Sequence, residues 1–142
     1  MSKKNAVQFH FLRPCTLPDR RILKKFILAI FRKENITVEE LNIVFCDDAY
    51  LLNLNRQFLQ HDFYTDILSF PLSEVNQPLV AEIYISVNRV QENARAVGAT
   101  LKTELHRVIF HGVLHFCGYK DKSDSDIKKM RITEDKYLKA YL

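Results

Sequence analysis

The chain has 142 residues, of which 47% are hydrophobic and 27% are charged, with three Gly and four Pro. This composition is typical of one globular domain and excludes disordered, collagen-like and low-complexity proteins. No apolar run approaches the roughly 20 residues that cross a bilayer, and the polar N-terminal residues do not resemble a secretory signal. Three widely separated cysteines do not indicate a disulfide framework. We therefore expect a cytoplasmic protein without membrane association and with one domain over residues 1–142.

The net charge of +4 is distributed unevenly along the chain. Residues 1–33 contain nine basic residues and one acidic residue, whereas residues 34–86 contain one basic residue and nine acidic residues. Residues 87–142 contain eleven basic and seven acidic residues. A basic segment of this kind can neutralise nucleic-acid phosphates. From charge alone, a solvated helix face is the simpler interpretation.

Hydrophobic periodicity predicts an alternation of strands and helices. Apolar residues alternate with polar ones near the N-terminus, which is typical of a strand, and later segments repeat their apolar residues at spacings of three and four, which is typical of helices. In chain order we expect a strand at 7–11, a helix at 19–35, a strand at 41–45, a helix beginning at Asp47 or Asp48, strands at 67–70 and 80–85, and helices at 87–97, 101–117 and 124–141.

Capping residues mark the ends of these helices. Ser86 and Thr100 precede two apolar repeats and are suitable N-caps, while Gly98 and Gly118 follow such repeats and are suitable stops. The third and fourth strands are separated by a short connection that contains proline, which favours an antiparallel pair.

The helix after the second strand is expected to bury Leu51, Leu54 and Phe58. The order of elements is β, α, β, α, β, β, α, α, α. It predicts an α+β fold: a single layer domain with a small mixed four-stranded sheet covered by about five helices.

Two histidines interrupt an apolar helix near the C-terminus. His111 and His115 are four residues apart, so both imidazoles project from one helix face. Gly118 permits a turn that brings the chain back toward that face, and Asp121 follows three residues later. Two imidazole nitrogens and one carboxylate oxygen suit Zn²⁺ and leave a fourth position for water. The alternative is an incidental pair of histidines without a metal.

Other metal proteins share parts of this pattern. A metalloprotease with a His-Glu-x-x-His motif has a Glu after the first histidine, where this chain has Gly112. An iron oxygenase with two histidines and one carboxylate has the same ligand types. A structural zinc site requires four protein ligands, and Cys117 is the nearby candidate, although it points from a different helix face. We favour an open site.

Several segments resemble the YbeY family of bacterial endoribonucleases. The run at 111–119, His-Gly-Val-Leu-His-Phe-Cys-Gly-Tyr, is similar to the family signature His-Gly-x-Leu-His-x-x-Gly-Tyr-Asp-His. The segment 65–70, Thr-Asp-Ile-Leu-Ser-Phe, resembles Thr-Asp-Val-Leu-Ser-Phe of that family. Leu52 and Asn53 resemble a Leu-Asn pair that precedes it, and 81–86 resembles a Gly-Asp-Ile-x-Ile-Ser strand. The resemblance spans roughly residues 40–122.

The resemblance implies a function in RNA metabolism. It implies a single-strand-specific, zinc-dependent endoribonuclease that matures the 3′ end of small-subunit ribosomal RNA and acts in ribosome quality control. Its partners would be single-stranded ribosomal RNA and the small ribosomal subunit, with one Zn²⁺ held by each chain. The alternatives are a ribosome assembly factor with a structural metal and no catalysis, or a metalloprotease-like hydrolase.

Two departures from the family pattern concern the site. Asp121 stands where the family has its third histidine, and Lys120 replaces the preceding Asp. Asp121 is expected to remain a ligand, and its carboxylate would also suit a divalent metal other than Zn²⁺. Leu59 stands where the family has an Arg, and Arg56, one helical turn earlier, is a candidate to replace it.

Further candidate residues are acidic or basic. Asp66 and Glu82 lie on segments that resemble the family and are candidates for the general base or for structural roles. The first helix is expected to follow the backbone of an RNA strand through Arg20, Arg21, Lys24 and Lys25.

Overall fold

A computed structural model describes residues 5–142. The order of elements follows the expected one, with small differences at the ends. The elements are β1 (Val7–Phe11), α1 (Arg20–Lys33), β2 (Val38–Cys46), α2 (Asp48–Leu59), β3 (Ile67–Pro71), β4 (Leu79–Ser86), α3 (Val87–Val97), α4 (Leu101–Phe116) and α5 (Asp124–Tyr141).

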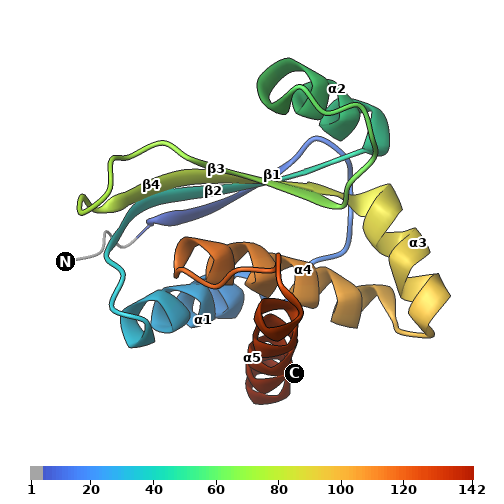
Figure 1. The fold of residues 1–142 in the computed structure, drawn as a ribbon. Helices are drawn as coiled ribbons and strands as arrows, with labels where there is room; N and C mark the ends of the chain where they lie inside the picture. The colour runs from blue at the N-terminus through green and yellow to red at the C-terminus, as the bar shows by residue number, and fades with distance from the viewer. Residues whose placement is uncertain (1–4) are drawn as a thin grey trace.

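The strands form one mixed sheet with the order β1-β2-β4-β3. The first three of these strands are parallel, and β3 pairs antiparallel with β4 at one edge. Figure 1 shows α1, α4 and α5 below the sheet and α2 above it. The predicted α+β fold, the four-stranded mixed sheet and the antiparallel pair are confirmed.

The predicted helix caps are present. The side chains of Asp47, Ser86 and Thr100 accept the backbone N–H groups at the starts of α2, α3 and α4, at 2.8, 3.2 and 3.1 Å. Gly98 ends α3 with a φ of 69°, in the left-handed region that favours glycine. Each cap satisfies backbone groups that the helix itself leaves unpaired. Local polar residues therefore determine where these helices begin and end.

The helix α4 lies across the lower face of the sheet and forms the centre of the core. Its buried residues include Leu105, Ile109, Phe110 and Val113. Gly112 faces the sheet at close range. A Cβ atom at this position would lie 2.8 Å from Ile67 Cδ1 and 3.0 Å from Ile83 Cδ1. The absence of a side chain therefore lets α4 pack closely against β3 and β4.

Gly112→Val is expected to lower the free energy of unfolding by about 1–3 kcal/mol, because it adds methyl groups to a filled space. Chemical denaturation with urea measures this change. Lys102→Val is the control for placing a valine in the same helix without the contact to the sheet, since Lys102 is exposed. Equal destabilisation of both variants would show that the contact with the sheet is not responsible.

The expected buried face of α2 is partly wrong. Leu51 is buried and Leu54 is half-buried, but Phe58 is 64% exposed. The buried residue on the last turns is Asn55, whose Nδ2 donates a hydrogen bond to the carbonyl of Phe63 at 3.0 Å. The helix packs on the sheet through Leu51 and Leu54, whereas Phe58 meets it only through an edge contact with Phe70 of β3, with ring centroids 6.1 Å apart. Periodicity predicted the helix but not how much of the Phe58 ring the edge strand covers.

The three cysteines are free thiols. Cys46 is buried, while Cys15 and Cys117 are half-buried. Burial raises the pKa of Cys117 to about 12, with a smaller contribution from Glu34. The thiol of Cys117 is therefore a poor source of thiolate at neutral pH. None of the helices in residues 5–142 combines the length and apolar composition needed to span a bilayer.

Candidate metal centre

The last turns of α4 bring His111 and His115 to the same side of the helix, as their spacing predicts. Gly118 follows the helix with a φ of 96°, in the left-handed region, and its N–H donates to the carbonyl of His115 at 3.1 Å. This turn redirects the chain back over the helix end. Asp121 consequently faces both histidines.

Three donor atoms converge at this point. His111 Nε2 and His115 Nε2 are 3.0 Å apart, and Asp121 Oδ2 lies 3.4 Å and 3.3 Å from them. Donors about 2.0–2.1 Å from a tetrahedral ion are separated by about 3.3 Å. These separations are compatible with one metal ion of the size of Zn²⁺ between the three atoms. In the part of the chain that the structure describes, these residues form the one such group of three.

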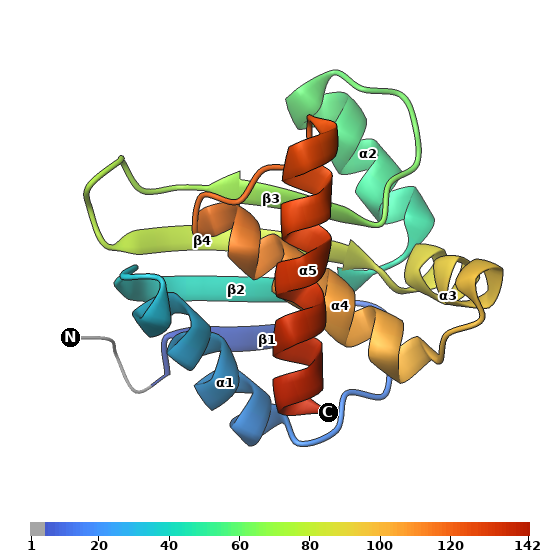
Figure 2. The same cartoon turned by 60° about the horizontal axis from the view of Figure 1, so that its bottom comes forward.

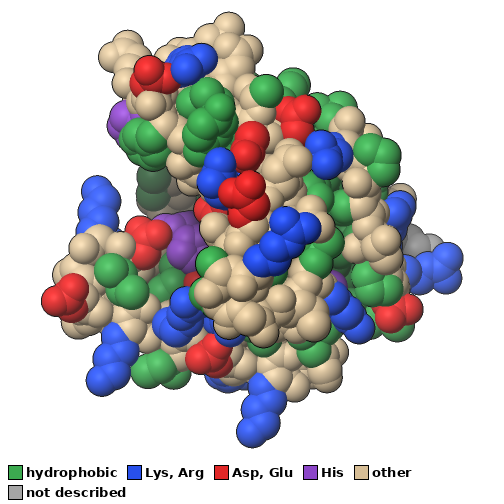
Figure 3. All heavy atoms as spheres, turned by 90° about the vertical axis from the view of Figure 1, so that its right-hand side faces the viewer, with side chains coloured by type: hydrophobic (Ala, Val, Ile, Leu, Met, Phe, Trp, Pro, Cys, Tyr) green, Lys and Arg blue, Asp and Glu red, His purple; other side chains and the backbone are tan. Residues whose placement is uncertain are grey.

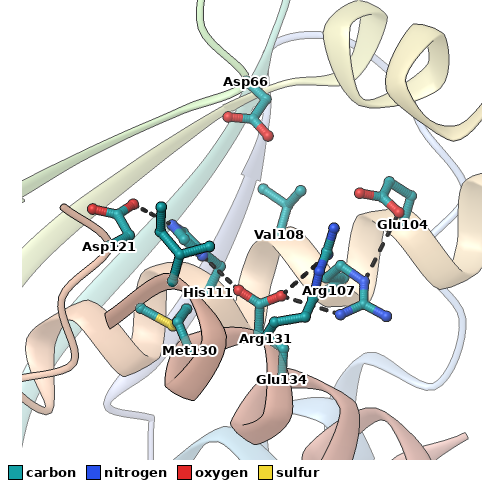
Figure 4. Close-up of a pocket in the computed structure, with 10 residues that line it drawn as sticks. Asp66, Glu104, Arg107, Val108, His111, Asp121, Met130, Arg131 and Glu134 are labelled. Carbon is teal, nitrogen blue, oxygen red and sulfur yellow. Dashed lines mark hydrogen bonds and ion pairs between the residues drawn. The ribbon is translucent and has the colours of Figure 1, made fainter. Parts of the chain in front are cut away.

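A buried carboxylate on α5 orients the first histidine. His111 Nδ1–H donates to Glu134 Oε2 at 2.6 Å, and Arg107 Nη1 donates to Glu134 Oε1 at 3.1 Å. Glu134 is only 4% exposed, so these bonds form away from bulk water. With Nδ1 protonated and engaged, Nε2 of His111 presents its lone pair to the other two donors. Figure 4 shows this carboxylate between His111 and Arg107.

The charges around His111 influence its protonation in the metal-free protein. Burial alone lowers the pKa of His111, but the hydrogen bond and charge of Glu134, together with Asp121 and Asp66, outweigh burial and raise it. Three carboxylates therefore attract positive charge to this imidazole. A divalent cation is attracted by the same field.

Asp66 belongs to the same site. Its carboxylate points into the pocket above His111, as Figure 4 shows. Burial raises the pKa of Asp66, with a smaller rise from Glu134, although His111 and two backbone hydrogen bonds act in the opposite direction. A raised pKa brings this carboxyl group closer to the range in which it can exchange protons during a reaction.

The donor atoms lie where several pockets adjoin one another, and we refer to these adjoining pockets as the groove. A pocket of about 440 Å³, lined in part by residues of α5, adjoins another of about 460 Å³ that is lined by β3. Asp66, His111 and Asp121 line both pockets. A third pocket of about 720 Å³, beneath the β3–β4 connection, shares His115 with the second. A chain molecule could therefore enter on one side of the three donors and leave on the other.

Comparison with known proteins identifies the family. A family model described as Endoribonuclease YbeY matches residues 17–142. The chain belongs to the YbeY family of endoribonucleases. The resemblance carried by the histidine motif is thereby confirmed.

Relatives of known name cover most of the chain. The endoribonuclease YbeY of Cytophaga hutchinsonii is 46% identical over 122 residues, which are 86% of this chain and 85% of the relative. That of Flavobacterium psychrophilum is 47% identical over 116 residues, 82% of each protein. The solution structure of TM1509 from Thermotoga maritima has a TM-score of 0.63 and 32% identity, and the match covers 92% of this chain and 87% of that one.

Some residues singled out from the YbeY resemblance lie away from the donor atoms. Glu82 is on the sheet face opposite α4, where its carboxylate accepts a hydrogen bond from Tyr84 at 3.0 Å. Arg56 forms an ion pair with Asp62 near the end of α2. Neither residue lines the pockets that hold the three donors. Of the weak catalytic candidates, Asp66 alone is brought to the site.

The basic residues proposed to contact RNA are also distant. Figure 2 shows α1 beside β1, at the opposite edge of the sheet from β3. Two of these residues lie over aromatic rings of β1: Arg20 over Phe11 at 4.2 Å and Lys24 over Phe9 at 5.5 Å. RNA binding by Arg20, Arg21, Lys24 and Lys25 stays a prediction, and it requires a strand that extends beyond the groove.

The geometry also bears on the other metal-protein classes. Gly112 faces Ile67 and Ile83, so a Glu at this position would point into the sheet and could not serve the protease-like site. Cys117 lines a separate pocket with Tyr119 and does not join the three donors. In the described residues the group thus offers three donor atoms, the number of protein ligands that catalytic zinc sites use.

Sequence reasoning missed Glu134 and Asn55. On α5 the buried residues are Met130, Glu134, Tyr137 and Leu138. A Glu within this apolar stripe is a detectable signal, because buried carboxylates require a partner. Asn55 was missed because the Leu-Asn pair of the family was matched to Leu52 and Asn53, and Asn53 is exposed. Asn55 itself follows Leu54 and is the Asn that the fold buries.

Proposed function

We propose that this protein is a metal-dependent endoribonuclease that cleaves single-stranded RNA during ribosomal RNA maturation. The processing step is the formation of the 3′ end of small-subunit ribosomal RNA, with a further role in ribosome quality control. The observation that carries this proposal is the convergence of His111, His115 and Asp121 where two pockets adjoin. Family membership supports RNA as the substrate.

The ligand residues suit Zn²⁺. His111, His115 and Asp121 would hold it, and it would supply Lewis acidity toward a phosphoryl oxygen and lower the pKa of a bound water toward about 7. Glu134 keeps the imidazole of His111 in the tautomer that the ion needs.

Asp66 is the proposed general base. Its carboxylate faces the donors from the β3 side, and its raised pKa favours proton uptake from the attacking water. Arg131 lines the pocket on the α5 side and is 60% exposed, so its guanidinium is free to approach a phosphate even though it also lies 3.6 Å from Glu134.

An open groove favours cleavage within a strand. A site that removed terminal nucleotides would need a closed end to hold the terminus, whereas the described pockets continue on both sides of the donors. This arrangement supports an endonuclease. It also argues against a purely structural metal, which would be enclosed by four protein ligands.

The test combines metal analysis with a cleavage assay. Purified protein is expected to contain one Zn²⁺ per chain and to cut single-stranded RNA, including a precursor of the small-subunit 3′ end, in preference to duplex RNA. A chelator should abolish cleavage, and added Zn²⁺ should restore it. Full cleavage after complete metal removal would overturn the metal-dependent mechanism.

Asp121 is expected to act as the third ligand. Asp121→Ala should weaken Zn²⁺ binding by on the order of a hundredfold or more, since outer partners of metal ligands already contribute about 10–100-fold. Asp121→His should retain Zn²⁺, because imidazole is also a suitable ligand. Competition titration with a chromogenic chelator measures both affinities. Lys120→Ala and Lys122→Ala are controls, and unchanged affinity in Asp121→Ala would exclude this carboxylate as a ligand.

A further inference from the structure

The connection between α2 and β3 exposes an unusual number of ring side chains. Phe63 and Tyr64 are 56% and 55% exposed, and His61 is also exposed. The rings of His61 and Phe63 are stacked, with centroids 5.1 Å apart and planes inclined by 21°. We refer to His61, Phe63 and Tyr64 as the aromatic loop. Exposed rings contribute little to the free energy of folding, and a group of exposed apolar side chains often marks a binding site.

The buried side chain and the backbone of Asn55 fix this loop. Nδ2 of Asn55 donates to the carbonyl of Phe63 at 3.0 Å, and the N–H of His61 donates to the carbonyl of Asn55 at 3.1 Å. Gln60, between them, has a φ of 55° and turns the chain out of α2. Both ends of the stacked pair are therefore attached to α2. The backbone that carries the two rings is thereby anchored to the helix.

Tyr64 is held from the other side by α3. The guanidinium of Arg89 lies 5.1 Å from the centre of the Tyr64 ring. Arg89 donates to Asp48 at 3.0 Å, and Ser86 donates to the other oxygen of Asp48 at 2.6 Å. Arg89 is thus fixed by polar contacts and occupies one face of the ring. More than half of Tyr64 still reaches solvent.

The aromatic loop leads directly into the groove. Thr65 follows Tyr64 and lines the same pocket as Asp66, His111, His115 and Asp121. Figure 3 shows a hollow with histidine side chains in it, and hydrophobic side chains gathered on the lobe formed by α2 and its loop above that hollow. A strand in the groove would therefore pass the aromatic loop next to the three donors.

The charge of this region determines which part of RNA it can contact. Residues 34–86 contain nine acidic residues and one basic residue, Arg56, which is paired with Asp62. Within the loop itself the one charged residue, Asp62, is paired with Arg56, so the loop offers rings and no unpaired cation, and the uncharged faces of bases stack on such rings. The loop thus suits bases and not the RNA backbone.

We propose that the aromatic loop is a stacking platform for unpaired bases of RNA next to the cleavage position. This inference rests on the proposed function, since it assigns a binding site to the same substrate. Bases in a duplex are stacked on one another and cannot offer their faces to protein rings. The platform therefore accepts single strands and rejects duplexes, and it selects substrates without reading their sequence.

Binding of an uncleavable strand tests this platform. The probe is a fluorescent 2′-O-methyl RNA of about 12 nucleotides without self-structure. Phe63→Ala and Tyr64→Ala should each bind it about tenfold more weakly, the loss expected when one stacked base loses its ring. Phe63→Tyr and Tyr64→Phe should restore binding. Val97→Ala is the control, because Val97 is 66% exposed at the end of α3 and lines none of the pockets around the three donors.

A second strand with abasic residues separates stacking from other effects. The parent protein should bind this strand more weakly than the normal one, and the two alanine variants should show little further loss. Parent-like affinity of Phe63→Ala and Tyr64→Ala for the normal strand would overturn the platform and favour a protein partner for the loop.

Two further results separate this inference from the proposed function. If the parent protein does not bind single-stranded RNA, the platform and the proposed function are both overturned. If binding depends on the platform while cleavage persists without metal, the platform is supported and the metal-dependent mechanism fails.

Discussion

His111→Ala and His115→Ala are each expected to lose stoichiometric Zn²⁺ and to reduce RNA cleavage by at least about a thousandfold. Two remaining ligands hold a zinc ion poorly. The ion stabilises the transition state by several kcal/mol, and each loss of about 1.4 kcal/mol slows the reaction about tenfold. The measurements are metal content after gel filtration and the single-turnover rate on a single-stranded RNA.

The control for these variants is His10→Ala. His10 is exposed on β1, where its Nε2 lies 2.8 Å from Asn42 Oδ1, and it takes no part in the groove. This variant should keep both metal and activity. If either His111→Ala or His115→Ala kept full metal content and the parent rate, the group of three donors would not be the catalytic site.

The parts of the fold that depend on local signals could be predicted from the sequence. Asp47, Ser86 and Thr100 cap helices because their side-chain oxygens accept N–H groups three residues later, which needs no information about distant segments. The two histidines could be placed on one face for the same reason, since helical spacing alone aligns them. Asp121 was expected nearby because Gly118 permits the left-handed turn that the structure contains.

Features that depend on how distant elements pack could not be predicted in this way. Period-two alternation cannot tell which sheet face receives α4, so Glu82 and Asp66 were equivalent candidates although the fold places them on different sides. Phe58 was expected to be buried because the pattern of α2 does not reveal that the edge strand β3 covers only one side of this ring, through Phe70. The burial of Glu134 depends on the contact of α5 with α4, which brings it to His111 and Arg107.

Glu134→Gln is expected to weaken Zn²⁺ binding and to lower the cleavage rate by about 10–100-fold, the usual effect of altering a partner that orients a metal-ligating histidine. The amide can still accept the proton of His111 Nδ1 through its oxygen, but it lacks the charge that makes the imidazole a better donor to a cation. Zinc competition titration and single-turnover kinetics measure the two effects.

Asp135→Asn distinguishes this role from a structural one. Asp135 is the neighbouring residue on α5 and pairs with the same Arg107 at 2.7 Å, but it is 57% exposed and does not contact His111. If Glu134 acts through His111, Asp135→Asn should keep the parent metal affinity while Glu134→Gln loses it. If Glu134 only secures α5 to Arg107, the two variants should have the same small effect on stability and none on zinc affinity. If Glu134 acts through His111, the Glu134→Gln variant lacks bound metal, and added Zn²⁺ should restore its cleavage rate toward that of the parent. If Glu134 only secures α5, added Zn²⁺ should not change the rate.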